Sequence, residues 1–286
     1  MTVLVTGATG TVGRHLVTQL LAAGQKVRAL TRDPAAAALP PEVDVVAGDL
    51  TSLGTLAAAF DGVTAAHLIN FGGGYQPLDN GPELVDLVVR SGIGRVTMLG
   101  GWQEGTVEPA VRASGLEWTH LRPLEFMGNT LPDWGPRLRR DGVIREPYGD
   151  RRSAAVHESD IAAVAAVALT EPGHAGQSYL VTGPEALSPR DKIRHLSAAT
   201  GRDLSFVELT PEETRREWVA GGGMPDLLLF RATDAEPAQL VEFLLRLYGN
   251  TPEYGYTVTG TVEKVTGRPA RTFAQWAVEH AEEFRP

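Results

Sequence analysis

Three glycines near the start of the chain are spaced so that they could hold a pyrophosphate. The stretch GATGTVG places Gly7, Gly10 and Gly13 three residues apart, directly after the apolar run TVLVT. In such a pattern the first glycine permits a tight turn and the second lets backbone N–H groups reach the phosphates. The third lets helix and strand pack closely. Because the stretch follows a strand and opens a helical pattern, it predicts dinucleotide binding rather than an unliganded glycine turn. The predicted cofactor contacts in this stretch are Gly7, Thr9, Gly10, Thr11, Val12 and Gly13.

The end of the second strand indicates which dinucleotide is bound. NAD sites carry an acidic residue about 20 residues after the glycines, where it binds the ribose 2′-hydroxyl. Here KVRALTRDP places Thr31 and Arg32 at that point, with Asp33 one step later. An arginine suits a 2′-phosphate through paired charge-assisted hydrogen bonds. NADPH is therefore the predicted cofactor. The alternative is an exposed loop arginine paired with Asp33.

Residues after the third and fourth strands extend the predicted site. AGDL places Asp49 and Leu50 beside the adenine, although Asp49 could instead cap a helix that begins at Thr51 or Ser52. Asn70 and Phe71 end the fourth strand, where Asn70 would face the cofactor and both would border the substrate. The alternative for Asn70 is an ordinary turn asparagine.

Gly100, Gly101 and Trp102 are further candidates for the substrate pocket, and two histidines are candidates for an acid. Gly100, Gly101 and Trp102 follow the fifth strand, where Trp102 could stack on an aromatic substrate or be an ordinary, partly buried aromatic residue. His120 lies within a strand, which favours a hydrogen-bonded core residue over an acid. His157 precedes a helix and is expected to be a loop or capping residue. The chain contains no HExxH, GxSxG or SxxK arrangement, and no metal site is predicted.

Strand and helix patterns alternate along the first two-thirds of the chain. Such alternation predicts right-handed βαβ crossovers and a parallel sheet covered on both faces. The expected helices span residues 11–23, 52–60, 82–91, 106–114, 158–170 and 188–200. The expected strands are TVLVT, KVRALTR, DVVAG, AAHLIN, RVTML, EWTHL and QSYLVTG. From about residue 204 the chain is expected to be mostly helical, with a break at Gly221–Gly223.

Composition limits the remaining possibilities. The chain has 286 residues, which suffices for one large α/β domain and an appended lobe. It has no cysteine, so disulfides, thiolate catalysis and Fe–S clusters are excluded. A net charge of −9 argues against nucleic acid, and no apolar run approaches the length of a membrane helix. A cytoplasmic monomer or homodimer that acts on a small molecule is expected.

Several motifs in order resemble the NmrA-like family, which belongs to the atypical, extended short-chain dehydrogenase/reductases. They are GATGTVG, TRDP, GDL, ASGLEWTHLRPLEFMGN, SDIAAVAAVAL and VEKVTGRPARTFAQWAVEHAEEF, and they cover essentially the whole chain. The resemblance implies a doubly wound Rossmann domain over residues 1–150. Residues 151–286 would complete the sheet (about 153–200) and form a smaller, mostly helical substrate lobe (about 204–286). It also implies that Pro123 and Leu124 contact the nicotinamide end, while Phe126 and Met127 shape the substrate pocket.

The family comparison exposes a missing catalytic group. Related reductases carry a serine or threonine after the fifth strand and a Tyr-x-x-x-Lys pair on the next helix. Here Gly100 and Gly101 replace the hydroxyl, and none of the three lysines lies four residues after a tyrosine. The catalytic residues are therefore unknown. A positioned acid contributes about 10²–10⁴ in rate, or roughly 3–5.5 kcal/mol, so the substrate should stabilise its own oxyanion.

Two functions follow from these features. The first is an NADPH-dependent reductase of a ketone or quinone in a small aromatic, polyketide-like substrate of secondary metabolism, with substrate-assisted protonation. The second is a non-catalytic NADP(H) sensor that regulates another protein, which the absent relay favours. The aromatic set Phe71, Trp102 and Phe126, with Met127, favours an enclosed substrate pocket and hence the first. Residues 210–255 are further expected to form a helical lid over that pocket.

Overall fold

The computed structural model of the chain describes residues 1–100, 104–220 and 235–286. Gly101 and Trp102, with the Gly221–Gly223 break, lie outside these ranges. The chain divides into two compact units, each of which gathers several separate segments. Unit 1 comprises Met1–Pro123, Glu158–Val181 and Thr261–Arg268. Unit 2 comprises Leu124–His157, Thr182–Gly260 and Pro269–Pro286.

Unit 1 is built on a seven-stranded parallel sheet in the order β3-β2-β1-β4-β5-β6-β8. This order is that of a doubly wound Rossmann sheet, which confirms the predicted fold class. The strands are β1 (Thr2–Val5), β2 (Lys26–Thr31), β3 (Asp44–Ala47), β4 (Ala65–Ile69), β5 (Arg95–Leu99), β6 (Glu117–Pro123) and β8 (Gln177–Val181). All seven coincide with strands expected from the sequence.

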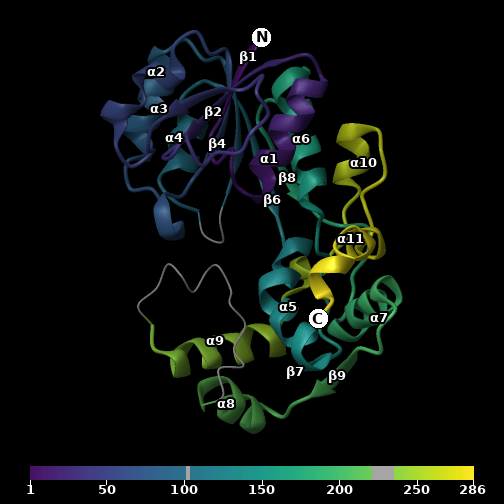
Figure 1. Cartoon of the computed structure of the whole chain (residues 1–286). Helices are drawn as coiled ribbons and strands as arrows, with labels where there is room; N and C mark the ends of the chain where they lie inside the picture. The colour runs from purple at the N-terminus through teal and green to yellow at the C-terminus, as the bar shows by residue number, and fades with distance from the viewer. Residues whose placement is uncertain (101–103, 221–234) are drawn as a thin grey trace. The chain divides into compact units, whose positions relative to one another are not determined.

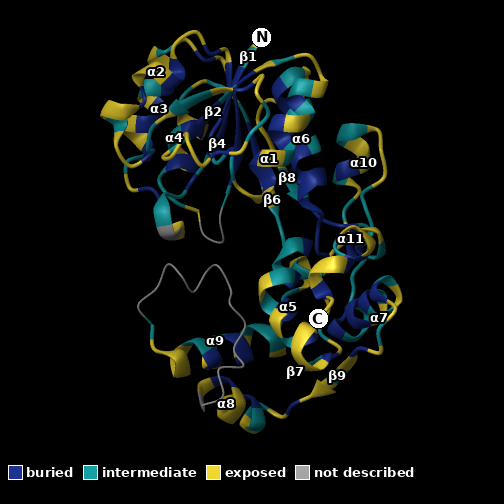
Figure 2. Ribbon diagram, viewed as in Figure 1, coloured by how far each residue is buried: buried dark blue, intermediate teal, exposed yellow. Residues whose placement is uncertain are grey.

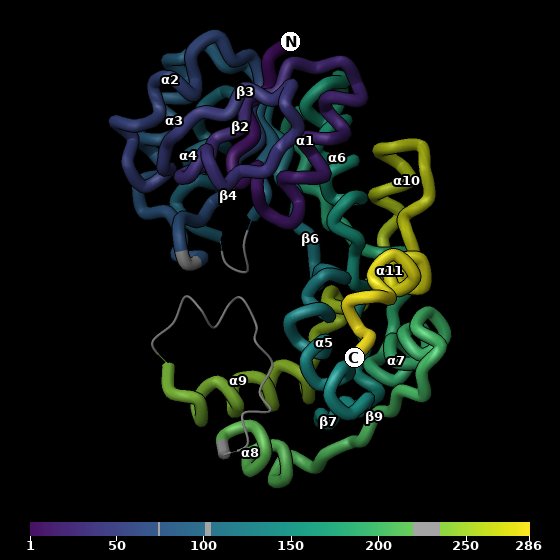
Figure 3. Tube along the Cα trace, in the orientation of Figure 1, coloured from purple at the N-terminus to yellow at the C-terminus, as the bar shows by residue number. Residues whose placement is uncertain are grey.

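Helices cover both faces of this sheet (Figure 1). On one face lie α2 (Ala57–Phe60), α3 (Gly81–Arg90) and α4 (Val107–Ala113); on the other lie α1 (Thr11–Ala22) and α6 (Glu158–Thr170). Leu4, Leu68 and Met98 on the strands pack against Leu84 and Val111 of the first group in one buried core, seen as dark blue in Figure 2. The trace in Figure 3 shows that α10 (Thr261–Thr266), far along the chain, returns beside α6.

Unit 2 is mainly helical but contains a small sheet. Its helices are α5 (Thr130–Asp141), α7 (Pro189–Thr200), α8 (Pro211–Ala220), α9 (Pro237–Gly249) and α11 (Phe273–Glu279). Short 3₁₀ turns are η3 (Met127–Asn129), η5 (Glu253–Gly255) and η6 (Ala281–Phe284). Two strands, β7 (Val143–Glu146) and β9 (Ser205–Glu208), pair in parallel. The buried core includes Trp134, Leu138, Leu196, Trp276 and Phe284.

Two expectations about local structure were wrong. The helix expected over residues 52–60 is split into η1 (Leu53–Thr55) and α2, which has only four residues. Gly54 lies within η1, just before the break at Leu56, and glycine costs about 1 kcal/mol in a helix relative to alanine. In addition, residues 205–208 form a strand at the start of the region expected to be mostly helical. The later part of that region does form helices.

Candidate functional site

The glycine turn after β1 has the geometry that its spacing predicted. Gly7 has φ +62°, a left-handed conformation that glycine adopts without strain. The Gly10 N–H donates to the Gly7 carbonyl oxygen at 2.9 Å, which closes the turn. A Cβ at Gly13 would overlap that same oxygen, so only glycine lets α1 begin this close to β1. Each glycine therefore has a separate steric reason for its identity.

The N-terminus of α1 follows this turn and is able to receive an anion. Its cap residue, Gly10, supplies no side-chain oxygen to the backbone N–H groups, and its first turn carries no acidic residue. The helix dipole therefore keeps its partial positive charge at this end. Thr11 is exposed, whereas Val12 is buried and could offer only its backbone. Thr9 accepts a hydrogen bond from Arg14 Nε at its carbonyl oxygen, 2.8 Å away.

Arg32 follows β2 as an exposed residue. Among the residues that the structure describes, its guanidinium makes no hydrogen bond or ion pair. Asp33 does not pair with it, because the Asp33 carboxylate accepts from the backbone N–H groups of Ala35 and Ala36. The alternative interpretation of Arg32 as the partner of Asp33 is therefore wrong. The arginine is left able to bind a ligand anion.

Asp49 and Leu50 follow β3 near Arg32. The Asp49 carboxylate accepts from the Thr51 N–H at 2.9 Å and from the Thr51 hydroxyl at 2.8 Å. The hydrogen bond from the Thr51 backbone is the main cause that lowers the pKa of Asp49, and Arg32 adds to it. Asp49 thus stabilises the turn before η1, but it does not cap a helix at Thr51 or Ser52, because η1 begins at Leu53 and its cap residue is Ser52. Leu50 is buried in the core of unit 1.

A buried polar cluster occupies the carboxyl ends of β4, β5 and β6. Asn70 donates from Nδ2 to Glu108 Oε1 at 2.5 Å, and the Gly105 N–H donates to Glu108 Oε2 at 2.9 Å. Asn70 and Glu108 are only 4% and 1% exposed, although Glu108 lies in the first turn of α4. Sequence analysis did not single out Glu108, because an acid in the first turn of a helix ordinarily faces solvent.

His120 and Gly100 complete this cluster. His120 Nε2 is buried and has no hydrogen-bond partner in the described part of the chain. A Cβ at Gly100 would lie 2.7 Å from that nitrogen, so the ring occupies space that a side chain at position 100 would need. Burial lowers the pKa of His120, and the carboxylate of Glu108 opposes this effect. The prediction of a hydrogen-bonded core histidine is therefore not met at Nε2.

The backbone N–H of Gly100 already has a hydrogen-bond partner within the protein. Its N–H donates to the Leu121 carbonyl oxygen at 3.3 Å, within the sheet. This N–H is therefore not available to a substrate oxygen at the place where related reductases carry a hydroxyl. The corresponding group of Gly101 lies outside the described residues.

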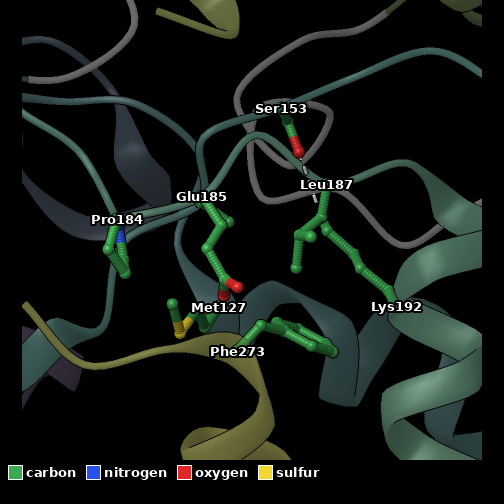
Figure 4. Close-up of a pocket in the computed structure, with 8 residues that line it drawn as sticks. Met127, Ser153, Pro184, Glu185, Leu187, Lys192 and Phe273 are labelled. Atoms are coloured by element: carbon green, nitrogen blue, oxygen red, sulfur yellow. Dashed lines mark hydrogen bonds between the residues drawn. The ribbon is translucent and has the colours of Figure 1, made fainter. Parts of the chain in front are cut away.

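The predicted residues that follow β6 belong to unit 2, except Pro123, which ends the strand itself. Phe126 pairs with Val156 in a short bridge, and the Met127 N–H donates to the Val156 carbonyl oxygen at 3.0 Å. Met127 is 1% exposed and lines a small pocket within unit 2 (Figure 4). The lining consists of Met127, Ser153, Ala155, Pro184, Glu185, Leu187, Lys192 and Phe273. Lys192 is held there by Glu125 at 2.6 Å and by Ser153 at 3.1 Å.

Unit 2 also contains a charged network that the sequence did not predict. Glu146, which is 1% exposed, accepts from Arg137 at 2.9 Å, from Arg151 at 2.7 Å and from the indole of Trp134 at 2.9 Å. Burial would raise the pKa of Glu146, but the two arginines outweigh it and the pKa is lowered. Arg151 also lies over the ring of Tyr248, 3.9 Å from its centre.

His157 is a structural residue of unit 2. It is 2% exposed, and its Nε2 lies 3.0 Å from the carboxylate of Glu279 on α11. The pair joins two segments that are 122 residues apart.

In the described ranges, no group of three or more His, Cys, Asp or Glu side chains could hold a metal ion. Within the same ranges, no helix is both long and apolar enough to cross a bilayer.

Comparisons with known proteins agree with this geometry. Residues 7–109 match a family model described as NAD(P)H-binding. The (4-alkanoyl-5-oxo-2,5-dihydrofuran-3-yl)methyl phosphate reductase of Streptomyces griseus is 36% identical over 99% of both chains. The NAD(P)H azoreductase of Xenophilus azovorans is also 36% identical over 99% of both chains. The crystal structure of NmrA, a negative transcriptional regulator, in complex with NADP has a TM-score of 0.70 at 19% identity, over 97% of this chain and 94% of that one.

Proposed function

The chain belongs to the NmrA-like family of atypical short-chain dehydrogenase/reductases and is an NAD(P)H-dependent oxidoreductase. We propose that it uses NADPH and that its substrate is a conjugated, electron-poor acceptor. The acceptor class that suits the site best is a quinone or an aromatic ketone of polyketide type. The observation that carries the proposal is an intact dinucleotide turn beside a sheet edge that lacks the Tyr-x-x-x-Lys pair.

The described residues fit NADPH. The turn at Gly7, Gly10 and Gly13 and the uncapped N-terminus of α1 would hold the pyrophosphate. Arg32, which has no partner among the described residues, would bind the ribose 2′-phosphate. NADPH when bound supplies the hydride. In this proposal Asn70 lies toward the nicotinamide side, with its amide held by Glu108.

The absence of a dedicated acid restricts the acceptor. An unactivated ketone becomes a strongly basic alkoxide that needs a proton at once, and a positioned acid is worth roughly 10²–10⁴ in rate. A quinone instead gives a delocalised, weakly basic oxyanion. A ketone beside a phenol gains a proton through its internal hydrogen bond. Such substrates tolerate a site in which the imidazole of His120 is buried and has a lowered pKa.

The names of the two full-length relatives support this acceptor class. One reduces an alkanoyl-substituted oxodihydrofuran phosphate and the other reduces azo compounds. The first substrate contains a ring double bond next to carbonyl groups, and the second contains an N=N bond. Neither requires hydride transfer to an isolated ketone.

The lid expected over residues 210–255 includes residues 221–234, which lie outside the described ranges, but the helices on either side of them, α8 and α9, are described. Within unit 2, α8 and α9 pack together through Trp218, whose ring meets that of Tyr248 edge-on at 6.5 Å. An ion pair between Arg215 and Glu242 at 2.5 Å joins the same two helices.

The test is NADPH oxidation with a panel of acceptors. We expect turnover of quinones and of aryl ketones that carry an adjacent phenol, and none of cyclohexanone. Methylation of that phenol should slow reduction strongly.

The second candidate function, a non-catalytic NADP(H) sensor, is favoured by the missing relay alone. Tight NADPH binding without oxidation of any panel member would support the sensor and contradict the reductase.

A further inference from the structure

The loop that follows β4 reaches back across the sheet to the end of β2. β4 pairs with β1, and β2 lies on the far side of β1. Nevertheless, a Cβ built at Gly73 would overlap Nη1 of Arg32, and one at Gly72 would lie 2.7 Å from the methyl group of Thr51. Residues 71–77, here called the β4 loop, therefore lie against the ends of β2 and β3.

Hydrogen bonds and ring contacts hold the β4 loop in this shape. The Gly72 N–H donates to the Gln76 carbonyl oxygen at 2.8 Å, and Phe71 and Pro77 form an antiparallel bridge. The rings of Phe71 and Tyr75 lie 5.3 Å apart. Tyr75 has φ +61°, a left-handed conformation that persists in a non-glycine residue only when its surroundings enforce it. These contacts hold the β4 loop in one conformation, in which Gly73 packs against the guanidinium of Arg32.

Arg32 combines close packing with unused hydrogen-bonding capacity. Its Nη1 lies so close to Gly73 that a Cβ on that residue would overlap it, and its guanidinium makes no hydrogen bond or ion pair to any described residue. A guanidinium binds a phosphate best when its planar donors are already oriented, because less side-chain freedom is then lost. A glycine is the residue that allows a flat group to approach the backbone this closely.

We propose that Gly73 is a positioning residue that sets the preference for NADPH over NADH by seating Arg32 for the ribose 2′-phosphate. The inference rests on the assignment of NADPH and Arg32 made above. Gly73 acts through Arg32 and leaves the rest of the dinucleotide site unaffected. A methyl group at position 73 displaces Nη1 and removes the oriented contact, while the charge of Arg32 stays nearby.

The test substitution is Gly73→Ala. Gly73 is not among the residues with positive φ, so alanine fits the backbone and only the contact with Arg32 changes. The matched control is Gly54→Ala in η1, where a Cβ meets nothing within 4 Å. Dissociation constants for NADPH and NADH are measured by calorimetry without substrate, for both variants, for Arg32→Ala and for Gly73→Ala combined with Arg32→Ala.

We expect Gly73→Ala to weaken NADPH binding on the order of 5- to 10-fold and NADH binding less than about 2-fold. Gly54→Ala should change neither, and Gly73→Ala should have no further effect once Arg32 is alanine. Equal weakening of both cofactors, or an undiminished effect in the Arg32→Ala background, would overturn the role of Gly73. If the parent protein itself does not prefer NADPH, the Arg32 assignment fails as well, which separates the two claims.

Discussion

The two units differ in how some of their charged side chains are paired. In unit 2, Glu146 is surrounded by two arginines and an indole, so its charge is neutralised within the protein. In unit 1, Glu108 is held by an amide and a backbone N–H, and Arg32 makes no ion pair in the described ranges. Charged groups that pair with one another within the protein stabilise the fold, whereas charged groups without a protein partner are available to a ligand. We therefore expect the network in unit 2 to stabilise the fold and the sheet edge of unit 1 to bind ligand.

The largest effect on stability should follow from a substitution in the charged network around Glu146. Glu146→Gln leaves Arg137 and Arg151 without their carboxylate, and loss of one partner from a buried ion pair costs about 3–5 kcal/mol. The free energy of unfolding, measured with urea, should fall by that amount. The control Glu117→Gln removes an exposed pair with Arg95 and should cost less than about 1 kcal/mol. A similar small loss for both variants would show that the network is not structural.

Asp133 should make the stability of the protein depend on pH. Burial raises the pKa of Asp133 to about 8, and the neighbouring carboxylates of Glu146 and Glu125 add to the shift. Its Oδ1 is buried without a partner in the described part of the chain. The folded state therefore keeps a proton that the unfolded chain releases above about pH 4, so stability falls as pH rises from 4 to 8.

The substitution Asp133→Asn should remove this dependence. Relative to the variant, the parent protein should lose up to about 1.4 kcal/mol of unfolding free energy for each pH unit between 5 and 7. As a control, the unfolding free energy of the Asp79→Asn variant, in which the changed residue is exposed, should vary with pH as that of the parent protein does. Parallel curves for Asp133→Asn as well would show that Asp133 is ionised in the folded state.

Arg32→Ala should affect cofactor choice and leave stability unchanged. Its guanidinium has no protein partner in the described ranges, so unfolding free energy should change by less than about 0.5 kcal/mol. Loss of a charged hydrogen bond should reduce the preference for NADPH over NADH by roughly 1.5–3 kcal/mol. Arg90→Ala, an exposed arginine on α3, serves as the control. Equal affinities of the parent protein for NADPH and NADH would contradict the assignment.

The sequence predicted unit 1 better than unit 2 for physical reasons. Buried strands and amphipathic helices leave periodic patterns, and all seven strands of the large sheet were recognised. By contrast, β7 and β9 are four-residue strands with charged or exposed positions, and α5 contains Pro136. Such elements form because tertiary packing overrides local preference.

The candidate site shows the same division. The glycine turn could be predicted because each glycine answers a local steric demand. Glu108 could not, because its burial depends on Asn70, 38 residues earlier in the chain. The contact of Gly73 with Arg32 likewise joins segments that are distant in sequence, and a glycine carries no pattern that marks its partner.

The most direct test of the central claim is single-turnover oxidation of NADPH by a quinone, followed in stopped flow. The account predicts that no side chain serves as an essential acid. Variants at Asn70, at His120, at His157 and at each tyrosine should therefore lose less than about 10²-fold in the rate of reduction. Methylation of a phenol adjacent to the carbonyl of a ketone substrate should cost more than any of them. One variant that binds NADPH normally but abolishes turnover would reveal a dedicated proton donor and contradict the account.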